Sequence, residues 1–205
     1  HLLVLKTERS GSIPAIENTM PDTLVFDLLV GDFNNDGWMD IAWIDTNGAA
    51  VIGENDHKGN FVPQTVGGLG LRIAAGDIDN DTYLDVIVSG ETIQIFQSDG
   101  VVSEITTTGN VQIVDADLDG DLDVVVNGTE FSVWEQDGTP VENEFQKVIL
   151  EAILEGGQRN NSLAVGGFVE VSAGGTYQKH LITGPMTHIG LGGKPADAIR
   201  VVWPN

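Results

Sequence analysis

The chain has 205 residues, no cysteine and a formal net charge of −22 at pH 7. The lack of cysteine excludes disulfides, zinc–thiolate sites and thiol nucleophiles. The acidic charge argues against nucleic acid and anionic lipid as partners, because both carry negative phosphates. Every apolar run is shorter than the about 18 residues of a membrane-spanning helix, so we expect no membrane insertion. With 41% hydrophobic residues, the chain is apolar enough to fold.

The negative charge is confined to the first part of the chain. Residues 1–150 contain 27 acidic and 5 basic residues, whereas residues 151–205 contain 4 of each. A change of this kind indicates a domain boundary near residue 150. We therefore expect two domains, at residues 1–145 and 146–205.

The first domain repeats one pattern three times. An apolar strand enters an acidic loop and a second apolar strand leaves it, with the loops beginning at Asp32, Asp77 and Asp115. The loops are thus 45 and 38 residues apart, a period typical of propeller blades or solenoids. The leucine spacing of a leucine-rich solenoid is absent.

A turn containing glycine follows the second strand of each repeat. Such turns favour hairpins because glycine and asparagine tolerate positive φ. They lie at Asn47-Gly48, Ser89-Gly90 and Asn127-Gly128, and we expect third strands at residues 50–53, 92–96 and 131–134. A weaker fourth strand precedes the next repeat. Four antiparallel strands in each repeat predict an all-β fold with about three propeller blades.

The acidic loops have the side chains that calcium prefers. Calcium takes six to eight oxygen ligands at about 2.3–2.6 Å. We number each loop from its first aspartate: side chains at loop positions 1, 3, 5 and 9 and the backbone carbonyl at position 7 are the candidate ligands. In the three loops these residues are Asp32, Asn34, Asp36, Trp38 and Asp40; Asp77, Asp79, Asp81, Tyr83 and Asp85; and Asp115, Asp117, Asp119, Asp121 and Asp123.

The alternative interpretation is that these loops are solvated acidic turns. Three or four carboxylates within nine residues repel one another unless a cation neutralises them, so we favour about three bound Ca²⁺ ions. Strands rather than helices flank the loops, which excludes EF-hands, and Mg²⁺ is a poorer candidate because it keeps its waters.

The second loop differs from the others at position 6, where the chain must turn sharply. Gly37 and Gly120 occupy this position in the first and third loops, but Thr82 occupies it in the second. A β-branched residue at positive φ costs about 1–2 kcal/mol. We therefore expect the second loop to be more distorted, or its ion to be held more weakly.

These loops and strands resemble the FG-GAP/VCBS repeat family over roughly residues 25–140, with VCBS the closer match. The resemblance implies a β-propeller whose calcium ligands are the side chains at positions 1, 3, 5 and 9. Three blades cannot close a propeller of the usual four to eight. We expect further N-terminal blades outside this chain, with self-assembly as the alternative.

The second domain predicts strands at about residues 164–172, 176–183 and 196–203, separated by glycine turns, and hence a small β-sandwich. Three segments resemble the ASPIC/UnbV domain, with Gly167 and Ile189 as departures from its pattern. They are residues 161–171, 188–193 and 198–205. Repeats followed by this domain resemble an arrangement found in bacterial secreted proteins and in cartilage acidic protein.

The sequence contains no recognisable catalytic constellation. It has no Gly-x-Ser-x-Gly elbow and no P-loop, and none of its four histidines forms a zinc-type pair. We therefore expect a non-catalytic calcium-binding module that is secreted, periplasmic or on the cell surface. It would serve structure, adhesion or assembly, with a protein partner or a second copy of itself.

Two alternatives remain open. One is a lectin-like protein that binds glycans through its tryptophans, although we expect these side chains to pack in the core: Trp38, Trp43, Trp134 and Trp203. The other is an accessory part of a polysaccharide-active or biosynthetic enzyme.

Overall fold

The computed structural model describes residues 24–136, 144–152 and 161–204, and all regular structure in these ranges is β-strand. The predicted all-β fold is confirmed. The first eleven strands are β1 (Asp27–Gly31), β2 (Asp40–Ile44), β3 (Ala50–Asn55), β4 (Phe61–Gly67), β5 (Gly70–Gly76), β6 (Asp85–Gly90), β7 (Ile93–Phe96), β8 (Val102–Ile105), β9 (Gly109–Val114), β10 (Asp123–Gly128) and β11 (Phe131–Trp134). The last five are β12 (Phe145–Ile149), β13 (Phe168–Ala173), β14 (Thr176–Leu181), β15 (Met186–Gly190) and β16 (Ala196–Val202). In the part of the chain that the structure describes, no helix is long and apolar enough to cross a membrane.

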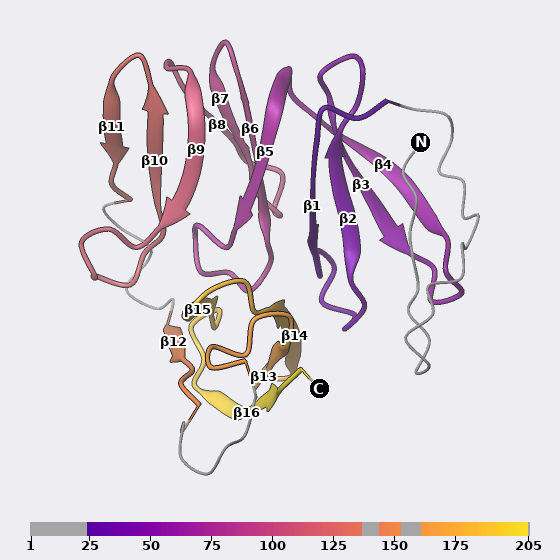
Figure 1. Cartoon of the computed structure of the whole chain (residues 1–205), viewed down its shortest axis with the longest axis vertical. Helices are drawn as coiled ribbons and strands as arrows, with labels where there is room; N and C mark the ends of the chain where they lie inside the picture. Colours follow the sequence, from indigo (N-terminus) through magenta and orange to yellow (C-terminus); the bar gives the residue numbers. More distant parts are fainter. Residues whose placement is uncertain (1–23, 137–143, 153–160, 205) are drawn as a thin grey trace.

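The repeats form three antiparallel sheets that stand side by side (Figure 1). The first two sheets have the strand orders β1-β2-β3-β4 and β5-β6-β7-β8, as expected for four-stranded blades. The third has the order β11-β10-β9 within the described residues. The third strands lie where the turn signals placed them, since β3, β7 and β11 each follow a glycine turn.

Apolar side chains fill the space between neighbouring sheets. The cluster that contains Ile44, Ala50 and Val88 joins the first sheet to the second. The cluster that contains Ile87 and Val126 joins the second sheet to the third. Strands β2 and β6 are buried along almost their whole length, because each lies inside its sheet and is covered on both faces. This explains why they are continuous apolar runs rather than alternating ones.

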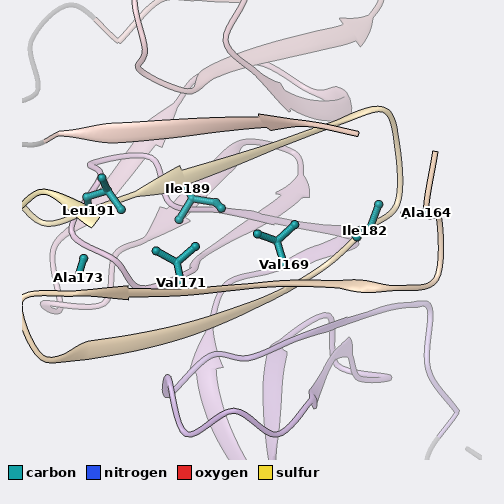
Figure 2. Close-up of a cluster of buried hydrophobic side chains, with 7 residues drawn as sticks. All are labelled: Ala164, Val169, Val171, Ala173, Ile182, Ile189 and Leu191. Atoms are coloured by element: carbon teal, nitrogen blue, oxygen red, sulfur yellow. The ribbon is translucent and has the colours of Figure 1, made fainter. Parts of the chain in front are cut away.

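The C-terminal strands form two small sheets, β12-β15 and β14-β13-β16. Figure 2 shows Val169 and Val171 on one side of the core and Ile189 on the other, and all three are at most 1% exposed. This is the small β-sandwich that the sequence predicts. Strands β12 and β15 were not predicted, and β12 begins at Phe145, just before the expected domain boundary.

The sandwich lies below the row of three sheets in Figure 1, at the ends of their strands. Strands β1, β5 and β9 all end at this side, so the three acidic loops that follow them face the sandwich. Contacts between the two parts include Lys179 with Gly37, His188 with Asn80, and Lys147 with Asp115.

Candidate metal centre

Each acidic loop is shaped by aspartate and asparagine side chains that accept hydrogen bonds from backbone N–H groups further along the loop. In the second loop, Asp77 accepts from Asp81 N at 2.9 Å and from Thr82 N at 3.0 Å. Asp79 accepts from Asp81 N at 3.2 Å, and Asp81 accepts from Tyr83 N at 2.8 Å. The first loop has the same four bonds, and the third has the equivalents from positions 1, 3 and 5. Short polar side chains that bond to nearby backbone favour tight turns, which is why this spacing folds as a loop.

Two residues in each loop have positive φ, at positions 4 and 6. Thr82 has the positive value expected at position 6, 93°, yet the second loop keeps the hydrogen bonds of the first. At position 4, φ is 57° for Asn35, 56° for Asn80 and 71° for Leu118. Asparagine tolerates this backbone region and leucine does not, so Leu118 is a strained residue that the sequence analysis missed.

The aspartate at position 9 has a structural role that the spacing alone did not reveal. Asp85 is fully buried and accepts hydrogen bonds from Ile78 N at 2.9 Å and Ser98 N at 3.2 Å. Ser98 lies just after the third strand of its sheet. Asp40 and Asp123 make the equivalent pairs of bonds. This residue therefore joins the start of the loop to the end of the third strand.

The structure brings the candidate ligands at positions 1, 3 and 9 together in two of the loops. In the second and third loops, one oxygen of each of these carboxylates lies within 4.8 Å of the others; the residues are Asp77, Asp79 and Asp85, and Asp115, Asp117 and Asp123. Two position 5 carboxylates have other partners. Asp36 is 2.8 Å from His57 Nε2, and Asp81 accepts from Ser98 Oγ at 2.6 Å.

Burial strongly disfavours negative charge in the first two loops. Desolvation is the main cause that raises the pKa of Asp77 to about 8, of Asp85 to about 7 and of Asp32 to about 6, and neighbouring carboxylates raise each pKa further. Asp115 differs. Burial would raise its pKa as well, but a hydrogen bond and the positive charge from Lys147 lower it below the ordinary value.

The donor set fits calcium. It consists of oxygen atoms alone, which suits a hard cation such as Ca²⁺ and does not suit zinc or copper. Asp115 Oδ1 is buried and has no hydrogen-bond partner, so an acceptor in the third loop is left for a further donor or a cation. In the second loop, burial disfavours ionisation of the carboxyl groups, and a bound cation would favour it.

The sandwich touches position 6 of all three loops, and the sequence analysis did not foresee this contact. A side-chain carbon added at Gly37 would meet the ring of Tyr177, and one at Gly120 would meet the ring of Phe145. A carbon added at Gly192 would lie 3.0 Å from the methyl group of Thr82. The glycine-rich segment that begins at Gly190 is the one sequence signal that could have indicated this close approach.

The second loop also makes close contacts with the sandwich. Gly190 packs so tightly that an added side-chain carbon would clash with Asp77 Oδ2 and with the backbone of Asn80. Gly192 N donates to Asn80 O at 2.9 Å, and His188 Nε2 is 2.8 Å from Asn80 Oδ1. Asn80 Nδ2 in turn donates to Asp121 Oδ1 of the third loop at 3.0 Å. Asn80 thus contacts both the sandwich and the third loop.

The four tryptophans divide into two groups. Trp43 is 5% exposed in the core beside the first sheet, and Trp203 packs against the sandwich core. Trp38 and Trp134 are 49% and 46% exposed, so the expected core packing does not hold for them. Trp38 stacks on His57, with 5.0 Å between the ring centroids.

Comparison with known proteins supports the repeat assignment. Residues 32–88 match the FG-GAP-like repeat family, and this span contains the first two acidic loops. FG-GAP-like repeats are typical of extracellular binding and structural modules. A search of the curated proteins finds no match for the chain. The resemblance of the C-terminal residues to the ASPIC/UnbV domain stays a prediction.

Proposed function

We propose that this chain is a non-catalytic, extracellular structural module whose acidic loops bind calcium, and that it serves adhesion or assembly. The observation that supports this most is the burial of negative charge at one end of the sheets. Asp77 and Asp85 are at most 3% exposed and lie within one acidic cluster. Buried carboxylates need a compensating cation to remain ionised.

Each ion would be held by side chains at loop positions 1, 3, 5 and 9 and by the carbonyl at position 7. Bound calcium would supply positive charge and fixed coordination, and no reaction step is assigned to it. Because the loops connect the first and second strands of each sheet and face the sandwich, calcium there would stabilise both parts and the contact between them.

The described histidines support a non-catalytic role. His57 contacts Asp36, His188 contacts Asn80, and His180 Nε2 is 3.0 Å from Gln178 Oε1. Burial lowers the pKa of His180 and of His188 to about 4, so both are neutral at physiological pH. These side chains serve contacts within the fold.

The outer face of the third sheet supports a role in assembly. Phe131 is 72% exposed, and Val133 and Val114 are both 38% exposed. The strand register places Val133 opposite Val125 and places Val114 on the same face of the sheet. An exposed apolar sheet face is typical of protein interaction sites. A protein that remains monomeric at all concentrations with calcium present would argue against self-assembly.

A second candidate function is glycan binding near the first two loops. Trp38 and Tyr83 both occupy loop position 7, and their side chains are 49% and 37% exposed. Exposed aromatic rings beside calcium could stack on sugar rings. Glycan-array binding that disappears with chelator, and also in the variant Trp38→Ala, would favour this function over a purely structural one.

The direct test of the proposal is calcium binding by isothermal titration calorimetry. Chelator-stripped protein should take up about three Ca²⁺ ions and bind Mg²⁺ far more weakly. The variant Asp79→Asn, which removes one carboxylate from the second loop, should weaken one site and leave the others unchanged. Absence of calcium binding at millimolar concentration would refute the proposal.

A further inference from the structure

We propose that Lys147 is a built-in counter-cation of the third loop, whose ammonium group competes with Ca²⁺ for Asp115. This inference rests on the proposed calcium function and adds a difference between the sites. The third loop should hold calcium more weakly than the first two. When calcium leaves, the ammonium group of Lys147 should take its place beside Asp115. From sequence alone, Thr82 points instead to the second loop as the more distorted or weaker one.

The contact between Lys147 and Asp115 is direct and buried. The Lys147 ammonium pairs with Asp115 Oδ2, and the exposed fractions of the two side chains are 20% and 0%. The same oxygen also accepts a hydrogen bond from Gly120 N at 3.0 Å, while Asp115 Oδ1 has no partner. At the same position of the other loops, Asp32 and Asp77 accept hydrogen bonds from their own backbones through both oxygens. The third loop therefore has a positive charge beside its first ligand.

The position of Lys147 on strand β12 directs its side chain toward the third loop. Val148 packs into the sandwich core, so its neighbour Lys147 points the other way. Phe145 lies on that same face, and its ring packs over Gly120 while Lys147 Nζ lies 5.3 Å from the ring centroid. The register pairs Lys147 with His188, which contacts Asn80 of the second loop. The lysine is thus positioned from a sheet that also contacts the second loop.

The third loop is also the most acidic, with aspartates at positions 1, 3, 5, 7 and 9. A lysine neutralises one charge of this cluster and calcium would neutralise two. Because like charges in contact repel strongly at partly buried sites, Ca²⁺ and the ammonium group cannot share Asp115 without a cost in free energy. Calcium bound to the free oxygen, Asp115 Oδ1, would therefore be opposed by the ammonium group on Oδ2 until the lysine moves away.

The test compares calcium binding by the whole chain and by the variant Lys147→Met, which keeps most of the apolar stem and removes the charge. In calorimetry, the wild type should show two tighter sites and one weaker site. The variant should bind calcium at that third site roughly tenfold more tightly, with the other two unchanged. The matched control is Lys179→Met. Lys179 also reaches a loop, but it donates to the carbonyl oxygen of Gly37 at 3.1 Å, so its removal should leave the third site unaltered.

A second measurement does not depend on how the variant folds. The side-chain ammonium signal of Lys147 in NMR spectra of the wild type should shift when the third equivalent of calcium binds. Three sites of equal affinity in wild type and variant, with an unchanged ammonium signal, would overturn this inference and leave the proposed calcium function standing. No calcium binding by either protein would overturn both.

Discussion

At the scale of single residues, each acidic loop depends on a left-handed backbone at positions 4 and 6. Asn35 and Asn80 accommodate it at position 4, and Gly37 and Gly120 accommodate it at position 6. Leu118 does so at a cost, because its side chain crowds the following carbonyl oxygen. Strain at this residue brings no burial in return, since Leu118 is 74% exposed.

We therefore predict that Leu118→Asn stabilises the protein by about 1 kcal/mol, because asparagine tolerates positive φ. Thermal unfolding monitored by circular dichroism would show this as a rise of a few degrees. Leu118→Ala is the control, since alanine shortens the side chain and keeps the strained geometry. An equal gain from both variants would show that exposure of leucine, and not its φ, is the source of the effect.

At the scale of strands and loops, the aspartate at position 9 joins each loop to the end of the third strand in the same sheet. Asp123 is 2% exposed and accepts from Ala116 N at 2.7 Å and from Gln136 N at 3.0 Å. These bonds link the carboxylate directly to two backbone N–H groups. Position 9 therefore supports the sheet directly.

The variant Asp123→Asn should destabilise the chain by about 1–3 kcal/mol in chelator as well as in calcium, because an amide presents one acceptor oxygen and leaves one buried N–H group unpaired. Asp119→Asn changes an exposed loop residue and should matter only when calcium is present. Chemical denaturation in both conditions separates the two effects. A position 9 variant that loses stability only in calcium would contradict the structural role.

The contact between the sandwich and the second loop depends on Gly190. Any side chain there would collide with Asp77 Oδ2 and the Asn80 backbone. We expect Gly190→Ala to cost about 1–3 kcal/mol through overpacking. It should also speed amide hydrogen exchange in β12 and β15. Gly184→Ala is the control, because nothing lies within 4 Å of an added carbon there. Unaltered exchange in Gly190→Ala would show that the sandwich does not need this close approach.

The sequence predicted the repeats well because their signals are local. Alternation, glycine turns and aspartate spacing all act within about ten residues, so β3, β7 and β11 were found. Strands β12 and β15 were missed because they are short and each is stabilised by a partner about 40 residues away. For the same reason, the spacing gave the candidate ligands and could not show that Tyr177, Phe145 and Gly190 pack against their loops.

At the scale of the whole molecule, negative charge is concentrated where the sheets meet the sandwich. The loops contribute buried carboxylates, and the sandwich contributes Lys147 and Lys179. Calcium in the loops would therefore stabilise the contact between the three sheets and the sandwich. The stability of the chain should consequently depend on both calcium and pH.

Without calcium, stability should fall as pH rises from about 5 to 8. The pKa of Asp77 is raised to about 8 and that of Asp85 to about 7, from the ordinary 3.8, so the folded state binds more protons than the unfolded one in this range. Each such group contributes up to about 1.4 kcal/mol per pH unit. The contribution is fully present below pH 3.8 and is lost as pH passes through the raised pKa. Melting temperatures measured in chelator should show this fall, and Asp77→Asn should reduce it. A flat or rising profile would contradict the buried-charge interpretation.

The central claim is that calcium in the acidic loops stabilises this fold, and paired thermal melts of the whole chain at pH 7.5 test it most directly. Ligand binding to the folded state alone contributes about 2.7 kcal/mol per site at a hundredfold excess over Kd. Millimolar calcium should therefore raise the melting temperature by roughly 10 °C or more over the melt in chelator. Magnesium at the same concentration should give a much smaller rise. Identical melting temperatures in calcium and in chelator would contradict the claim.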